Sequence, residues 1–180
     1  AFSMCTECRK YYPEFRVSIN LSYVQILKSP LMMELKQIID HSGISCSGII
    51  VELTESGYLE GTPAVRSVWN DMKQLRIQIA LDDFGTGYSN LMNISNLEPD
   101  IVKLDRGFTL KALSRSYEYQ LMQYVIEMVH KLNQYVCVEG VETKEDLEKI
   151  KALGPDLIQG YYYSKPCSRD EFLKKFFDYS

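Results

Sequence analysis

Acidic side chains gather at the ends of the short apolar runs in this 180-residue sequence. Seven carboxylates and one lysine end or closely follow these runs: Glu52, Glu55, Asp82, Asp83, Asp105, Glu139, Glu142 and Lys103. If the runs are parallel strands, their ends meet at one edge and bring the carboxylates together. Packing so much like charge into one mouth is costly unless counter-ions neutralise it. The set therefore predicts bound cations.

The side-chain types indicate which cations. Hard divalent cations take oxygen ligands, and Asn20 at the end of the first run adds a neutral oxygen. The lack of nearby His or Cys favours Mg²⁺ or Mn²⁺ over zinc. The adjacent Asp82 and Asp83 are suited to two ions, and ions ~3.5–4 Å apart are a standard device for phosphoryl displacement. The residues thus predict metal-assisted phosphate-ester chemistry.

Each residue also has a plainer interpretation. A strand-end acid is usually a helix cap or a solvated loop residue. Glu55 can serve only to orient a loop, Asp105 only to hold Lys103 in an ion pair, and Lys103 is as easily structural as catalytic. The prediction depends on six strand ends agreeing and not on any one side chain.

Six runs rich in Val and Ile are the predicted strands: 16–21, 48–53, 77–81, 100–104, 135–138 and 156–161. They alternate little, as expected of strands covered on both faces. Helical patterns between them begin at these places: Ser29-Pro30, Thr62-Pro63, after Tyr88, before Leu121, at Thr143 and at Ser168. This alternation predicts a parallel α/β fold.

The loop chemistry favours one parallel architecture. No GxGxxG follows a strand, whereas polar residues end nearly every strand, as in a TIM-type (β/α)8 barrel. Six strands are two units short of eight. We therefore expect a single domain over residues 1–180 that is a truncated, six-β/α-unit portion of such a barrel.

Composition excludes several protein classes. Twenty basic against 24 acidic residues give a net charge of −4, which argues against a nucleic-acid partner. No apolar run is long enough for a membrane span, and the first residues do not resemble a secretion signal. Five scattered cysteines indicate a reducing, cytoplasmic compartment. We interpret Cys5 and Cys8 as two ordinary thiols on a helix, because a closed zinc site needs further ligands.

Six segments resemble, in order, the motifs of the EAL-domain cyclic di-GMP phosphodiesterases. They are VSINLS (17–22), VELTES (51–56), LDDFGTGYSNL (81–91), DIVKLDRGF (100–108), VEGVET (138–143) and LIQGYYYSKP (157–166). The third is the most specific. The likeness extends from about residue 16 to the end of the chain.

The resemblance implies hydrolysis of cyclic di-GMP to linear pGpG with two ions, Mg²⁺ or Mn²⁺. It assigns four residues to the metals: Asn20, Glu52, Asp82 and, for the second ion, Asp83. Lys103 and Glu139 are similar to the residues that position and deprotonate the attacking water.

The resemblance also implies roles around that centre. Gln159 corresponds to a substrate contact on the guanine side, and Asp105 to a partner of the site around Lys103. Glu55 anchors the DDFG loop, which in the family helps to form a dimer interface, and Glu142 lies behind the ligands. Sensory or GGDEF-type domains are expected in the parent protein.

One family motif is missing. The Glu-Ala-Leu segment and its following Arg belong upstream of VSINLS, and the chain begins too late to contain them. We expect the fragment to be weak or inactive, and to form homodimers or oligomers through its two sheet edges. Two alternatives remain open. One is a non-catalytic cyclic di-GMP receptor or scaffold, and the other is a magnesium-dependent barrel acting on carboxylates, like the enolase group.

Overall fold

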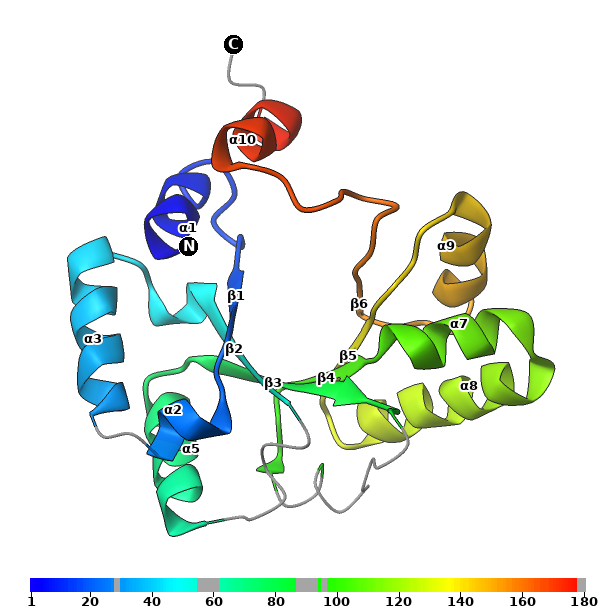
Figure 1. The fold of residues 1–180 in the computed structure, drawn as a ribbon, viewed down its shortest axis with the longest axis horizontal. Coiled ribbons are helices and arrows are strands. Elements are labelled where there is room, and N and C mark those ends of the chain that lie inside the picture. The colour runs from blue at the N-terminus through cyan, green and yellow to red at the C-terminus, as the bar shows by residue number, and fades with distance from the viewer. Residues whose placement is uncertain (28–29, 55–61, 87–93, 95–96, 178–180) are drawn as a thin grey trace. The chain divides into compact units, whose positions relative to one another are not determined.

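Six parallel strands form the sheet of the protein (Figure 1). The structure is a computed structural model that describes residues 1–27, 30–54, 62–86, 94 and 97–177. In chain order the strands are β1 (Val17–Asn20), β2 (Ile49–Thr54), β3 (Gln78–Phe84), β4 (Ile101–Leu104), β5 (Tyr135–Val138) and β6 (Leu157–Ile158). They are neighbours in the same order. The predicted α/β fold of six β/α units is confirmed.

Helices alternate with these strands. They are α1 (Phe2–Cys8), α2 (Tyr23–Leu27), α3 (Leu31–Ser42), α5 (Pro63–Gln74), α7 (Arg106–Ser114), α8 (Ser116–Lys131), α9 (Lys144–Lys151) and α10 (Arg169–Phe177). A 3-10 turn at Cys46–Gly48 leads into β2. Among the described residues, no helix combines the length and the apolar character that a membrane crossing needs.

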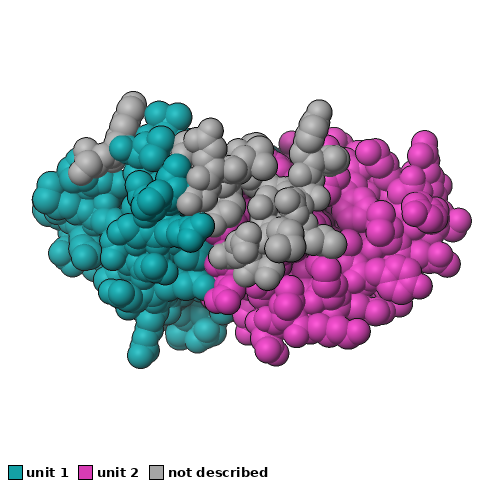
Figure 2. Space-filling view, turned by 90° about the horizontal axis from the view of Figure 1, so that it is seen from below, with its two compact units in different colours: residues 1–52, 60–78, 166–180 teal, residues 53–59, 79–165 magenta. Residues whose placement is uncertain are grey.

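The chain divides into two compact units (Figure 2). Unit 1 comprises Ala1–Glu52, Glu60–Gln78 and Pro166–Ser180, and unit 2 comprises Leu53–Leu59 and Ile79–Lys165. In unit 1 the core includes Trp69 and Met72 of α5. In unit 2 the core includes Met122 and Val129 of α8 and Val102 of β4, all fully buried.

Several helix starts follow from local capping. Thr62 accepts a hydrogen bond from the Val65 amide at the start of α5, as its Thr-Pro sequence predicts. Thr143 and Asp146 form a reciprocal capping box at α9. At α3 the prediction was one residue early, because the helix begins at Leu31 with Pro30 in the cap position, and Ser29 lies outside the described residues.

The predicted capping box of the last helix is confirmed. The Glu171 carboxylate accepts hydrogen bonds from the amide and the hydroxyl of Ser168, both at 2.8 Å. These hydrogen bonds lower the pKa of Glu171. Arg169, one residue into this turn, forms an ion pair with Glu7 of α1. Helix α10 is thereby joined to the helix that precedes β1.

Cys5 and Cys8 are buried, free thiols on α1. Burial raises the pKa of both thiols, which keeps them protonated at neutral pH. The interpretation of this CxxC as two ordinary helical cysteines agrees with their position.

Four strands differ in length from the prediction, and β1 and β4 are shorter than predicted by two residues and one residue. β3 continues to Phe84 where the prediction ended it at residue 81, and its register with β4 is irregular between Leu81 and Phe84. β6 contains only Leu157 and Ile158, because the chain turns away at residues 160–163. The helix expected after Tyr88 falls largely outside the described residues.

Two aspartates fix the register of unit 2 in the same manner. Asp100, just before β4, donates its amide to the Ile79 carbonyl (2.9 Å) and accepts the Ile79 amide at its Oδ2 (2.8 Å). Asp156, just before β6, makes the same pair of contacts with Val136 of β5, at 3.1 and 2.7 Å. The Asp156 Oδ2 atom also contacts His130 Nε2 at 2.9 Å.

Candidate functional site

Three of the predicted site residues meet at the ends of β3, β4 and β5 in unit 2. The Lys103 ammonium lies 2.9 Å from Asp82 Oδ1 and 2.7 Å from Glu139 Oε1. Lys103 is 5% exposed, and both carboxylates are mostly shielded from solvent. The predicted convergence of strand-end charges is therefore present for this trio.

The irregularity in β3 sets the direction of Asp82. The pairing passes from Leu81–Val102 to Phe84–Leu104, so two aspartates of β3 stand opposite the single Lys103 of β4. This is the two-against-one geometry of a β-bulge, a device that re-aims side chains near active sites.

Asp83, the second aspartate of the bulge, has a left-handed backbone with φ 60°. Aspartate tolerates this conformation better than most residues do. Asp82 and Asp83 therefore do not simply end β3, as the sequence suggested, but form its bulge.

Burial makes the Lys103 trio energetically sensitive. Taking these charges out of water is costly, and the attraction between them offsets that cost only while all partners stay in place. Removing one partner from a buried ion pair typically destabilises a protein by about 3–5 kcal/mol. The trio should therefore be sensitive to the loss of any one partner.

The oxygen donors of the site match a hard divalent cation in type. Asp82 Oδ1 is buried and accepts no hydrogen bond of good geometry, although Lys103 Nζ lies nearby, so it keeps acceptor capacity. Among the residues that the structure describes, no three His, Cys, Asp or Glu side chains form a ready metal cluster. The fit to Mg²⁺ or Mn²⁺ is one of donor chemistry.

Asn20 and Glu52 lie side by side in unit 1. They are register partners at the ends of β1 and β2, and the Leu21 amide donates to the Glu52 carbonyl at 2.9 Å. Glu52 is buried, whereas Asn20 is exposed. Their assignment as metal ligands stays a prediction.

The remaining predicted residues lie near the strand ends or outside the described chain. The Asp105 carboxylate caps α7, accepting from the amides of Gly107 (2.7 Å) and Phe108 (3.3 Å). Gln159 directly follows β6 and is exposed. Glu55 lies outside the described residues.

Arg106 was missed by sequence reasoning, although it stands within the quoted DIVKLDRGF segment. It begins α7, and its Nη2 lies 2.8 Å from Oε1 of Glu142, a predicted residue that follows β5. No local pattern reveals this pair, because its partners are far apart in the sequence.

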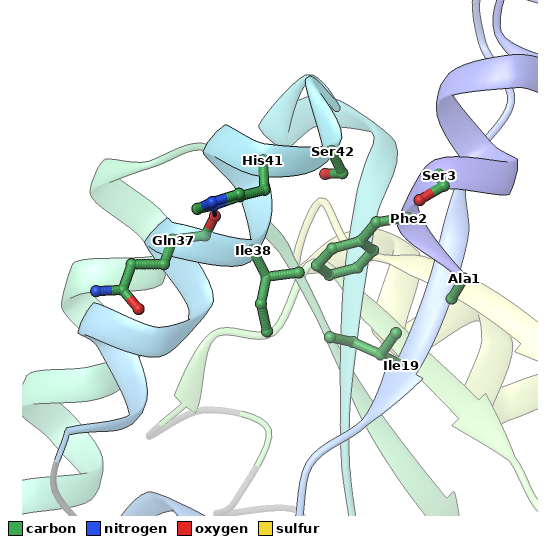
Figure 3. Close-up of a pocket in the computed structure, with 8 residues that line it drawn as sticks. All are labelled: Ala1, Phe2, Ser3, Ile19, Gln37, Ile38, His41 and Ser42. Carbon is green, nitrogen blue, oxygen red and sulfur yellow. Dashed lines mark hydrogen bonds between the residues drawn. The ribbon is translucent and has the colours of Figure 1, made fainter.

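A cavity of about 590 Å³ lies elsewhere, in unit 1. Figure 3 shows the Phe2 ring facing Ile38 of α3 and Ile19 of β1, with His41 and Gln37 on the α3 side. None of the predicted site residues lines it.

Comparison with known proteins agrees with the motifs. The profile of the EAL domain matches residues 1–166, so the match begins before the expected residue 16 and ends before the last helix. Cyclic di-GMP phosphodiesterase PdeF of Escherichia coli (strain K12) is 32% identical over 160 residues, which are 89% of this chain and 21% of that protein. The chain thus spans about a fifth of that relative's length.

Solved structures share the fold. The EAL enzyme Bd1971, in its cAMP and cyclic di-GMP bound form, gives a TM-score of 0.90 at 27% identity, covering 97% of this chain and 48% of that one. The manganese and cyclic di-GMP complex of Klebsiella pneumoniae BlrP1 gives 0.85 at 24% identity, covering 93% and 43%, a likeness of fold. The TIM-type barrel assignment is confirmed, and the chain belongs to the EAL domain family.

Proposed function

We propose that the protein containing this chain hydrolyses one phosphodiester bond of cyclic di-GMP to give linear pGpG. The observation that carries the proposal is the buried Lys103 trio at adjacent strand ends. Family membership supports it, because relatives such as PdeF are named cyclic di-GMP phosphodiesterases.

Glu139 and Lys103 supply the proton chemistry in this proposal. A carboxylate held by an ammonium 2.7 Å away is fixed in direction and can accept a proton from an attacking water. Lys103 also stabilises negative charge that develops on the phosphate, since it is buried where electrostatic interactions are strong. Neither residue can do this work if the other moves away.

Asp82 and Asp83 are the proposed cation ligands of unit 2, and Asn20 and Glu52 remain predicted ligands. The cation is Mg²⁺ or Mn²⁺, with two ions expected, and it would neutralise phosphate charge and lower the pKa of bound water. Cyclic di-GMP, with Gln159 on the guanine side, is the proposed substrate, and further sensory or GGDEF-type domains are proposed for the parent.

A turnover assay tests the function. The 180-residue chain and the parent protein that contains it are each incubated with cyclic di-GMP and Mg²⁺ or Mn²⁺, and products are resolved by anion-exchange chromatography. Glu139→Gln keeps the side-chain shape and should abolish pGpG formation. Glu148→Gln, on the exposed face of α9, is the matched control and should leave the rate unchanged.

The same samples address the receptor alternative. Titration calorimetry with cyclic di-GMP, in Ca²⁺ to suppress turnover, measures binding separately. Binding without product by the 180-residue chain would agree with the weak or inactive fragment that the sequence predicts. Binding without product by the parent protein would contradict the phosphodiesterase proposal and favour a non-catalytic receptor. Product that survives Glu139→Gln would remove Glu139 from the mechanism.

A further inference from the structure

The turn that carries Glu139 is packed against Arg106. Gly140, the next residue, has a left-handed backbone with φ +79°, a conformation that favours glycine. A Cβ atom at this position would lie 2.3 Å from Arg106 Cγ and 2.8 Å from Arg106 Cβ. The stem of Arg106 therefore lies directly on the backbone that follows Glu139.

The head of the same arginine holds the far end of that turn. Arg106 Nη2 and Nε lie 2.8 and 3.2 Å from one oxygen, Oε1 of Glu142. The hydrogen bond and the charge of Glu142 raise the pKa of Arg106, so the guanidinium stays charged. One side chain at the start of α7 thus contacts this turn at both Gly140 and Glu142.

The opposite side of the turn is closed by backbone. The Val141 amide donates to the Gln159 carbonyl at 3.2 Å, and the Tyr162 amide donates to the Val141 carbonyl at 3.0 Å. A Cβ at Gly160 would lie 2.0 Å from that Val141 carbonyl oxygen, so the approach is as close as a glycine permits. The turn is therefore confined between Arg106 and the segment after β6.

The Glu139 end of the turn is fixed to β4. The Glu139 amide donates to the Leu104 carbonyl at 3.1 Å, and its carboxylate reaches Lys103. The backbone can pivot at the glycine that follows, because glycine has the widest choice of φ and ψ. The Arg106 stem is what limits that pivot from the α7 side.

The Arg106–Glu142 pair contributes little to overall stability by itself. Its side chains are 58% and 38% exposed, and exposed ion pairs are typically worth about 0–1 kcal/mol. Because the pair lies next to Glu139, its loss should change the position of the Glu139 carboxylate more than it changes the free energy of unfolding. A misplacement of about 1 Å at a reacting group can cost about 100-fold in rate.

From this packing we infer that Arg106 is a positioning residue, which holds the Gly140 turn so that the Glu139 carboxylate faces Lys103. The inference rests on the proposed function, in which Glu139 accepts the proton of water. Arg106 itself touches no reacting atom in this role.

Kinetics of three variants test the role. Arg106→Ala should lower kcat by about 10–100-fold, as losses of residues that orient ligands do, and change KM much less. Arg106→Lys keeps the stem against Gly140 but loses the planar fork, so part of the rate should return. Arg115→Ala is the matched control, since Arg115 forms an exposed pair with Glu118 at 3.1 Å.

A second readout does not depend on turnover. In the same variants, amide NMR shifts and hydrogen exchange are measured at Glu139, Gly140 and Val141. Arg106→Ala should shift these amides and speed exchange at Glu139 and Val141, whereas Arg115→Ala should not. Equal effects of the two alanine variants on these amides and on kcat would overturn the inference.

The two readouts separate the possible failures. If the parent protein gives no pGpG, the proposed function fails, and the amide data still decide whether Arg106 holds the turn. If turnover is present but Arg106→Ala changes neither kcat nor the amides, the positioning role is wrong and the function stands.

Discussion

β1 and β4 are both four residues long, and each contains a predicted site residue. The two strands differ in burial. All four residues of β4 are buried, and Lys103 is held between two carboxylates. Residues of β1 alternate between partly exposed and exposed, and Asn20 belongs to the exposed set. The two predicted site residues thus lie in very different surroundings, Lys103 in a buried strand and Asn20 in a strand that is partly exposed.

The difference follows from position in the sheet. β4 has β3 and β5 as neighbours, whereas β1, first in the strand order, pairs with β2 among the described strands. A strand with neighbours on both sides can bury a charge if partners from both sides reach it. We expect substitutions on β4 to change folding and chemistry together, and those on β1 to change association.

The largest effect is expected at Lys103. Lys103→Met leaves the Asp82 and Glu139 carboxylates close together without their ammonium, so turnover should fall by about 100–1000-fold. The free energy of unfolding should fall by about 3–5 kcal/mol, measured by urea denaturation. Lys144→Met, at an exposed pair 4.0 Å from Glu148, should change stability by less than about 0.5 kcal/mol. Similar losses of stability in both variants would contradict the expected difference between a buried and an exposed ion pair.

Ser18→Lys tests β1 as an association edge. Ser18 is exposed on this strand, and a lysine there opposes edge-to-edge pairing of strands. We expect self-association, followed by sedimentation velocity over a concentration series, to weaken by about tenfold or more, which corresponds to about 1.4 kcal/mol. Gln120→Lys on α8 adds the same charge elsewhere and should leave association unchanged. A clean monomer before any substitution would contradict the expected homodimer.

Asp105→Ala sharpens the comparison on the β4 side. This substitution removes the cap of α7 directly after β4, and the loss of such a cap typically costs about 1 kcal/mol. The urea midpoint should fall, while Asp105→Asn should retain most of the stability, because asparagine is also a good cap. An unchanged midpoint for the alanine variant would mean that the two amide hydrogen bonds of Asp105 do not stabilise the helix.

The smallest effect is expected from Glu171, in the unit that contains β1. Its folded pKa lies below the ordinary value of 4.5, so its stabilisation is present above the pKa of the unfolded carboxyl and lost as pH falls through the folded pKa. Glu171→Gln should therefore reduce the stability gained as pH rises from the folded pKa of Glu171 to its unfolded pKa, measured by thermal unfolding at a series of pH values. The reduction should be smaller than the Asp105→Ala effect, and an identical pH dependence in the two proteins would contradict a stabilising role for the Glu171 carboxylate.

Features that depend on neighbouring residues were predictable from the sequence. The cap at Thr143 and the box at Ser168 and Glu171 were found at the right residues, because each is built within one helical turn. Helix α7 is not among the predicted helices, although a helix cap is one interpretation of a strand-end acid and Asp105 caps this helix.

Features that depend on pairing between strands were not predictable. The bulge of Asp82 and Asp83 exists only because β4 offers a single residue opposite them. The Arg106–Glu142 pair joins the start of α7 to the turn after β5, and only the fold brings these two places together. The identities of Lys103, Asp82 and Glu139 as site residues could be predicted from the sequence, but the distances between their charged groups could not.

The two aspartates that precede β4 and β6 have a consequence for how such a chain can be rebuilt. Each supplies both an amide and a carboxylate oxygen to one residue of the previous strand, and the two copies stand two β/α units apart. The side chain that makes this connection belongs to the segment just before β4 or β6, and the preceding strand contributes only backbone groups. A segment of two β/α units that begins at such an aspartate therefore contains the residue that aligns it with the preceding strand. Such a segment is a suitable unit for recombination or circular permutation.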